Sequence, residues 1–309
     1  MDVTQHTTEG PSPVTDILAG TIAEMTWFQV EQAARDGAVV LWAFGVIEQH
    51  GPHLPTGTDV YLPSARLVEV QRELGRRGVP ALVLPPFYWG VNVVSASFPA
   101  SYSVRPSVIQ ELMSDVLLGL ARDGFRHIFC FSGHGDALHN ATVHGGARLG
   151  AERAGVDVSF VADAALATRL GLDLDDPHVT VSGPVAGHPS VERVVASSPS
   201  TPAGAPAPEG FVDVHAGRWE SAQMLSARPD LVREESRVAL PSTDLGPDAL
   251  AVWRQGFDAA RSTTPLGYFG DPAAATVDEG RASLRESAVE AAEAIVSRVE
   301  RMRSSATAD

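Results

Sequence analysis

Short apolar runs alternate with amphipathic segments along the first half of the chain. The apolar runs predict strands at 38–44, 81–84, 127–131 and 156–161. Helical spacing of apolar residues predicts helices at 26–36, 62–77, 107–123 and 137–154. Continuous apolar runs are typical of strands covered on both faces. The order therefore predicts an α/β fold, a single three-layer α/β/α domain with a mostly parallel sheet.

The pattern is lost between about 171 and 210, and helical spacing returns at 216–227 and 278–303. Proline, alanine and serine dominate 197–210, which predicts an exposed loop. Residues 1–15 are polar with two prolines and predict a disordered tail, and 304–309 predict a short C-terminal tail. We therefore expect one domain over 16–303.

Composition narrows the classes of partner. The chain has 309 residues, 44% of them hydrophobic, which is enough for one large core. A net charge of −15 disfavours nucleic acid and anionic membranes as partners. Its one cysteine, Cys130, excludes an internal disulfide and a thiolate-rich zinc site. No apolar stretch approaches the roughly 18 residues of a membrane span, and no secretory leader is visible, so we expect a cytoplasmic protein.

A loop after the first predicted strand carries the strongest chemical signal. Glu48, His50, His53 and Asp59 lie within twelve positions, and glycine and proline restrict the path of the loop. Imidazole and carboxylate ligands suit Zn²⁺, Mn²⁺ or Fe²⁺. Polar residues also gather in ordinary surface loops, but this combination favours a metal site.

A second polar loop follows the strand at 127–131. His134 and Asp136 are candidate ligands, and His139 could support a ligand or be a solvated residue at the start of a helix. In a parallel sheet the loops at the carboxyl ends of strands meet at one edge. We therefore expect both loops to face the same crevice.

A third segment pairs His215, just before a predicted helix, with Glu220 in its early turns. Such a pair can act as a proton donor with its orienting carboxylate. A histidine at a helix start is also commonly structural, so this segment alone does not distinguish a catalytic from a structural role.

Together the three segments resemble the creatininase (creatinine amidohydrolase) family. The motif E-Q-H-G-P-H-L-P-x-G-T-D is read from Glu48 to Asp59 without a gap, G-H-G begins at Gly133, and H-A-G-x-x-E begins at His215. The resemblance covers about 18–300. It implies the single α/β/α domain, two divalent ions per subunit, and homo-oligomers, hexamers among them.

The resemblance also implies roles for individual residues. Glu48 and His134 would bind one ion, His50 and Asp136 the other, and Asp59 would bridge them. The ions would turn a shared water into hydroxide, because metal binding lowers the pKa of water to roughly 7.

The other implied roles concern proton transfer and substrate. His215 would protonate the leaving nitrogen, with Glu220 orienting it. Candidate substrate-binding residues near the motifs are Trp89, Asn92, Ser95, Ser101 and Trp219.

Three departures from the family pattern lie close to these motifs. Asp136 stands where relatives have glutamate or glycine, and Ser95 replaces a usual histidine. Ala137 replaces the asparagine that closes the second motif, and the nearest one is Asn140. These changes argue against creatinine itself as the substrate.

The expected function is therefore hydrolysis of a non-peptide C–N bond in a small molecule, a cyclic amide, formamide or related amide, by a metal-bound hydroxide. The same site could instead form an amide or lactam, or hydrolyse a C–C bond of a keto-cyclitol. A catalytically silent scaffold is the alternative from another class, and a protein purified without metal would favour it. No Gly-x-Ser-x-Gly elbow and no phosphate-binding loop occur in the chain.

Overall fold

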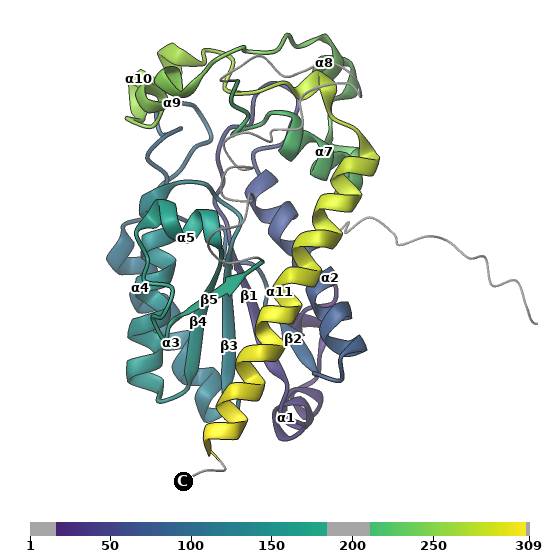
Figure 1. Cartoon of the computed structure of the whole chain (residues 1–309), viewed down its shortest axis with the longest axis vertical. Coiled ribbons are helices and arrows are strands. Elements are labelled where there is room, and N and C mark those ends of the chain that lie inside the picture. The colour runs from purple at the N-terminus through teal and green to yellow at the C-terminus, as the bar shows by residue number, and fades with distance from the viewer. Residues whose placement is uncertain (1–16, 184–210, 307–309) are drawn as a thin grey trace, which may run out of the picture.

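The structure is a computed structural model that describes residues 17–183 and 211–306 (Figure 1). The tail predicted at 1–15 and the loop predicted at 197–210 lie outside the described residues. The last helix continues to Ala306, three residues into the segment predicted as a C-terminal tail.

Five parallel strands form one sheet in the order β2-β1-β3-β4-β5. They are β1 Val39–Phe44, β2 Ala81–Val83, β3 His127–Ser132, β4 Asp157–Asp163 and β5 Val179–Ser182. The predicted parallel sheet is confirmed. β5 lies in the region where the sequence showed no pattern, because a strand of four residues at the sheet edge gives almost no periodic signal.

Helices precede, connect and follow the strands. They are η1 Ile22–Glu24, α1 Trp27–Arg35, α2 Thr58–Arg76, α3 Pro106–Arg122, α4 Ala137–Ala154, α5 Ala164–Leu170, α7 Arg218–Ala227, η2 Pro229–Leu231, α8 Glu234–Ala239, α9 Pro247–Trp253, α10 Phe257–Thr263, η3 Pro272–Ala274 and α11 Val277–Ala306. The predicted helix at 62–77 begins four residues earlier, at Thr58, so that Asp59 lies in its first turn.

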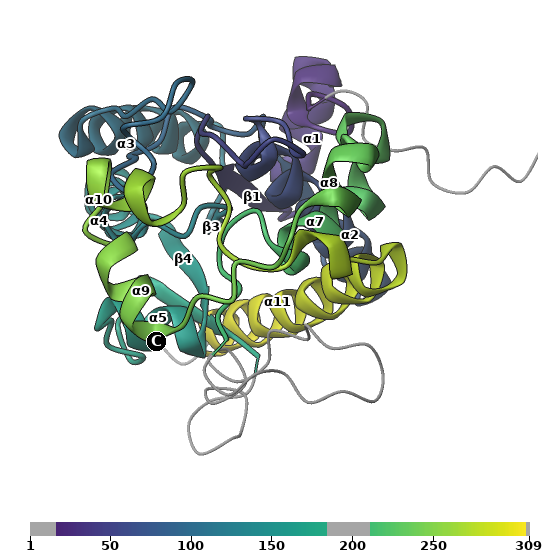
Figure 2. The same ribbon diagram turned by 90° about the horizontal axis from the view of Figure 1, so that it is seen from above.

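The sheet is covered on both faces, which confirms the three-layer α/β/α fold (Figures 1 and 2). β1 is buried along its whole length, and its side chains alternate between two cores. Val40 and Trp42 pack in the core that α3 and α4 complete. Val39 and Leu41 pack in the core that α2 and α11 complete.

A cap of short helices closes one end of the molecule. α7, α8, α9 and α10 gather there in Figure 1, beyond the sheet. A third apolar cluster joins this cap to the layers below, with Leu62 from α2, Met224 from α7 and Leu284 from α11. A Cβ on Gly280 of α11 would lie 1.8 Å from the carbonyl oxygen of Ala222, so α7 and α11 are in backbone contact there.

An ion pair fastens α11 to β4. Arg298 Nη2 lies 2.5 Å from Asp157 Oδ1, and both side chains are close to fully buried. His127 on β3 contacts the other oxygen of Asp157 at 3.1 Å. Burial alone would raise the pKa of Asp157, but the bonds from His127 and Arg298 hold it below its usual range.

Because its pKa is lower in the folded state than in the unfolded chain, Asp157 stabilises the fold above about pH 4, and this contribution is lost as the pH falls through the folded pKa. We therefore expect Asp157→Asn to lose about 3 kcal/mol of unfolding free energy at pH 7, since it leaves the largely buried Arg298 without an anionic partner. Urea unfolding at several pH values checks this, and the difference from the wild type should shrink below pH 4.

The control is Asp278→Asn, because the pair of Asp278 with Arg281 is exposed. This variant should change the unfolding free energy by less than about 1 kcal/mol. An Asp157→Asn protein as stable as the wild type at pH 7 would contradict the assigned role.

Candidate metal centre

Six titratable side chains converge beyond the carboxyl ends of β1 and β3, and each is 9% exposed or less. They are Glu48, His50, Asp59, His134, His215 and Glu220. Glu48 and His50 lie in the loop after β1, Asp59 in the first turn of α2, and His134 after β3. His215 directly precedes α7, and Glu220 lies in its first turn. The three segments singled out in the sequence therefore meet at one place.

Two glycines allow the strand ends to approach the first turn of α2. A Cβ on Gly45 would lie 2.1 Å from the backbone oxygen of Asp59, and a Cβ on Gly133 would lie 2.6 Å from the same atom. Pro63 has no N–H to donate to this oxygen, as residue 63 of a regular helix would. Only glycine permits such close contact, so these positions set the depth of Asp59 in the site.

The Asp59 carboxylate lies between two imidazoles. Its Oδ1 is 3.2 Å from His50 Nε2, and its Oδ2 is 2.8 Å from His134 Nδ1. Its position in the first turn of α2 adds the positive end of the helix dipole. One oxygen facing each histidine is the arrangement that a carboxylate bridging two cations requires.

Glu48 is held by one oxygen and presents the other. Its Oε2 accepts hydrogen bonds from Asn92 Nδ2 at 3.0 Å and from the Ser95 hydroxyl. Its Oε1 lies 3.1 Å from His134 Nδ1. Asn92 and Ser95 are both buried, so they orient this carboxylate and do not line an open pocket.

A backbone contact orients the His50 ring. Its Nδ1 lies 3.2 Å from the carbonyl oxygen of Glu48, to which it can donate a hydrogen bond. Nε2 faces Asp59 Oδ1 at 3.2 Å and Glu220 Oε2 at 3.6 Å, and in the neutral ring it would present its lone pair to a cation there. Such an outer hydrogen bond is how proteins fix the tautomer of a metal-binding histidine.

The structure does not bring Asp136 into this cluster. Its Oδ1 accepts from the backbone N–H groups of Leu138 and His139 at the start of α4, and its Oδ2 accepts from Val93 N–H at 2.9 Å. Both oxygens are therefore committed to the backbone. The carboxylate that stands beside His50 and Asp59 is Glu220, which the sequence had suggested only as a partner of His215.

The cluster has the donor set and the charge balance of a metal site. Burial alone would lower the pKa of His50, but the carboxylates of Asp59 and Glu220 raise it to about 10. Burial alone would also lower the pKa of His134, but the carboxylates of Glu48 and Asp59 raise it well above its usual value. In the metal-free protein, protons on these two rings would balance the negative charge of the carboxylates. Bound cations would take the place of those protons.

Unpartnered atoms in the cluster also fit a metal. His50 Nε2 and Asp59 Oδ2 are fully buried, and neither makes a hydrogen bond of good geometry within the described residues, although ion-pair distances link them to neighbours. Buried polar atoms without partners are costly in a folded protein, and a bound cation would satisfy them. Three groups of side chains could each hold one ion: Glu48, Asp59 and His134; His50, Asp59 and Glu220; and Glu48, His50 and His215. Only the first two share Asp59 as a bridging ligand.

His215 differs from the other two histidines of the cluster. Burial and the neighbouring His50 lower its pKa to about 4, so the ring is neutral at pH 7. Its Nε2 lies 2.9 Å from the carbonyl oxygen of Gln49, and its Nδ1 faces Glu48 Oε1 at 3.8 Å. The Trp253 ring, which the sequence did not single out, lies 5.6 Å from the His215 ring.

The remaining predicted residues have other surroundings. Ser101 Oγ accepts from the backbone N–H of Gln49 at 3.0 Å. Trp89 and Trp219 are 45% and 51% exposed, and Trp219 donates to Ser283. A role of these three side chains in binding substrate stays a prediction from the sequence.

Two further histidines and an asparagine support the loops. His53 Nε2 lies 2.9 Å from Ser221 Oγ, and His139 Nδ1 accepts from Val91 N–H at 3.2 Å. Asn140 donates to the carbonyl oxygens of His134 and Asp136. It thus ties the second loop from inside α4, three positions after the place where relatives carry their asparagine.

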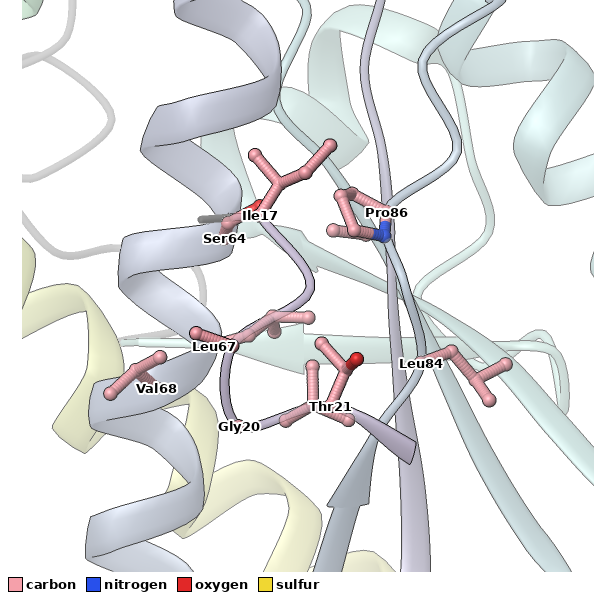
Figure 3. Close-up of a pocket in the computed structure, with 11 residues that line it drawn as sticks. Ile17, Gly20, Thr21, Ser64, Leu67, Val68, Leu84 and Pro86 are labelled. Carbon is pink, nitrogen blue, oxygen red and sulfur yellow. The ribbon is translucent and has the colours of Figure 1, made fainter. Parts of the chain in front are cut away.

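A separate pocket lies between residues 17–21, α2 and the end of β2 (Figure 3). Its wall is apolar apart from two hydroxyls, and these donate to backbone oxygens: Thr21 to Leu18 and Ser64 to Val60. No carboxylate or imidazole lines it, so this pocket offers no candidate catalytic group. Among the described residues, no helix is long and apolar enough to cross a membrane.

Comparison with known proteins agrees with the geometry. A family model described as "Creatininase: Creatinine amidohydrolase" matches residues 23–295. A creatinine amidohydrolase of Pseudomonas putida is 30% identical over 119 residues, 37% of this chain and 44% of that relative's length. A mycofactocin precursor peptide peptidase of Mycolicibacterium smegmatis is 27% identical over 243 residues, 78% of each chain.

A solved structure of a creatininase variant of the Zn-Zn type is similar with a TM-score of 0.62 and 25% identity, over 89% of this chain and 96% of that one. The fold and the carboxylate–histidine centre thus define a metal-dependent amidohydrolase. The chain belongs to the creatininase family.

Metal analysis distinguishes the possible ligands. We expect Asp59→Ala to lose both ions, Glu220→Gln to lose one, and Asp136→Asn to keep both, because Asp136 binds only backbone N–H groups. Asp136→Asn should cost about 1 kcal/mol of stability, because asparagine caps a helix as well as aspartate does but has no second oxygen to accept from Val93 N–H. Metal content after dialysis checks the number of ions, and urea unfolding checks the stability. Loss of an ion in Asp136→Asn, with both ions kept in Glu220→Gln, would make Asp136 the ligand in place of Glu220.

Proposed function

We propose that this protein hydrolyses a non-peptide C–N bond, of the cyclic amide or formamide type, in a small molecule, on two divalent ions. The observation that supports it best is the convergence of three carboxylates and three imidazoles in one buried cluster, two of whose groups share Asp59. Glu48, Asp59 and His134 would hold one ion, and His50, Asp59 and Glu220 the other. Imidazole and carboxylate ligands are suited to zinc, manganese or iron.

Bound divalent ions would supply two things here, a water acidic enough to deprotonate near neutral pH and a polarised carbonyl group. The chain's own residues do the rest. Asn92 and Ser95 hold Glu48 in place, and the carbonyl oxygen of Glu48 orients His50. These contacts fix the geometry before the substrate arrives, which is the usual requirement for efficient catalysis.

His215 is suited to moving the proton. With Nε2–H donating to Gln49 O, its Nδ1 is free on the side that faces Glu48 and Glu220. A neutral imidazole can take a proton at Nδ1 from the attacking water and return it to the leaving nitrogen. Its burial, which lowers the pKa to about 4, makes the protonated ring a strong donor.

The direct test is a panel of lactams, formamides and keto-cyclitols with protein loaded separately with zinc, manganese or iron. We expect turnover of an amide, loss of it on chelation, and none by Asp59→Ala. Turnover of keto-cyclitols alone would move the assignment to C–C hydrolysis. A protein that retains none of the metals would favour a scaffold. A homo-oligomer and a cytoplasmic location stay predictions from the sequence.

His215→Ala should keep both ions and lose about 10²–10⁴-fold in kcat, the usual contribution of general acid–base catalysis. A suitable control is His178→Ala, since His178 contacts the backbone of β4 and lies outside the cluster. Metal content and kcat on the substrate found by the panel are the readouts. Wild-type turnover would exclude the proton-transfer role, and loss of metal would instead make His215 a ligand.

A further inference from the structure

A buried hydrogen bond joins two of the segments that carry the clustered side chains. His53 Nε2 lies 2.9 Å from Ser221 Oγ, and both side chains are fully buried. His53 lies three residues after His50 in the loop after β1, and Ser221 directly follows Glu220 in α7. Neither His53 nor Ser221 is among the described side chains that could hold an ion. We call the ion assigned to His50, Asp59 and Glu220 the second ion.

The turn between His50 and His53 has little freedom. Gly51 has a φ of +66°, which favours glycine, and the ring of Pro52 restricts its own φ. The carbonyl oxygen of His53 accepts a hydrogen bond from Arg233 N–H at 2.8 Å. The positions of the His50 and His53 rings are therefore coupled through a stiff piece of backbone.

Glu220 lies among like charges and needs a restraint. Its Oε2 accepts a hydrogen bond from Ala216 N–H at 2.5 Å. Burial raises the pKa of Glu220 to about 7, and the charges of Asp59 and Glu48 act in the same direction. Repulsion from those two carboxylates favours movement of α7 away from the loop. The bond between His53 and Ser221 opposes that movement.

These contacts close a ring around the place of the second ion. The ring runs from His50 through the turn to His53 and across the hydrogen bond to Ser221. Glu220 completes it, because its Oε2 faces His50 Nε2 at 3.6 Å. Two ligand atoms about 2.1 Å from a tetrahedral zinc ion lie roughly 3.4 Å apart. The ring therefore holds these two atoms near the separation that one ion needs.

The bond adds no charge to the centre. Burial and the charge of His50 lower the pKa of His53 to about 4, so its ring is neutral at pH 7. A neutral imidazole and a hydroxyl can hold the two segments together without competing with a cation for the carboxylates.

We propose that His53 and Ser221 are positioning residues, whose hydrogen bond sets the separation of His50 and Glu220 and thereby the affinity for the second ion. The other ion depends on different contacts, since Asn92 and Ser95 hold Glu48. Partners behind the ligands typically contribute about 10–100-fold to metal affinity. The proposal rests on the two-ion centre of the proposed function and adds which contact controls its second ion.

Calorimetric titration of Zn²⁺ into chelator-treated protein tests the proposal without a substrate. The wild type should take up two ions, and Glu220→Gln identifies the step that belongs to the second ion. His53→Leu and Ser221→Ala should each weaken that step about 10–100-fold and leave the other step unchanged. His53→Gln keeps a polar nitrogen in reach of Ser221 and should retain part of the affinity.

The double variant distinguishes one shared bond from two separate effects. If both residues act through the same hydrogen bond, His53→Leu combined with Ser221→Ala should weaken the second ion no more than the more damaging single change. Losses that multiply would overturn the proposal. Wild-type affinity in either single variant, or equal weakening of both ions, would overturn it too.

A matched control removes a buried hydrogen bond elsewhere in the sheet. Ser159 Oγ and Thr180 Oγ1 lie 2.7 Å apart between β4 and β5, and both side chains are buried. Ser159→Ala should lower the urea midpoint of chelator-treated protein about as much as Ser221→Ala does, and it should keep both ion affinities. A weakened second ion in Ser159→Ala would show that affinity merely follows stability, against the proposal.

The two proposals fail in different ways. A protein whose second ion depends on His53 and Ser221 but which hydrolyses none of the panel would keep the positioning role and lose the amidohydrolase function. Amide hydrolysis by a protein whose ion affinities are unchanged in both single variants would do the reverse.

Discussion

The site depends on the contact between two strand ends and one backbone oxygen. Gly45 after β1 and Gly133 after β3 both press against the carbonyl oxygen of Asp59, which Pro63 leaves without its helical N–H partner. This contact sets where α2 begins relative to the sheet. It thereby places the Asp59 carboxylate between a histidine from each loop, and any side chain larger than hydrogen at either glycine would push α2 away.

Around Asp59 the protein gathers charges that would be unstable separately. Three carboxylates are buried with two imidazoles that are protonated in the absence of metal, and each carboxylate has a further hydrogen bond or ion pair. Burial raises the pKa of Glu220 to about 7, against the opposing charge of His50. A centre of this kind is costly to form unless cations or protons compensate, which is why its occupancy and its stability are linked.

Much of this could be predicted from the sequence, because apolar runs mark buried strands and the motif loops follow them. β1, β3 and α4 were predicted within one or two residues. The role of Asp136 could not be predicted in this way, because an aspartate before a helix is equally suited to cap the helix or to bind metal. Its fate depends on the N–H of Val93, which lies 43 positions away in the chain. Asn92 and Ser95 likewise needed the structure to show that they face Glu48.

α11 supplies none of the six clustered side chains, yet it packs against both helices that supply carboxylates, α2 with Asp59 and α7 with Glu220. At Gly280 the backbone of α11 touches that of α7, so the separation of α7 and α11 has almost no freedom to relax. Ligand distances distinguish one divalent ion from another by only a few tenths of an ångström. A helix that supplies no ligand would thus help to set which ionic radius the centre accepts.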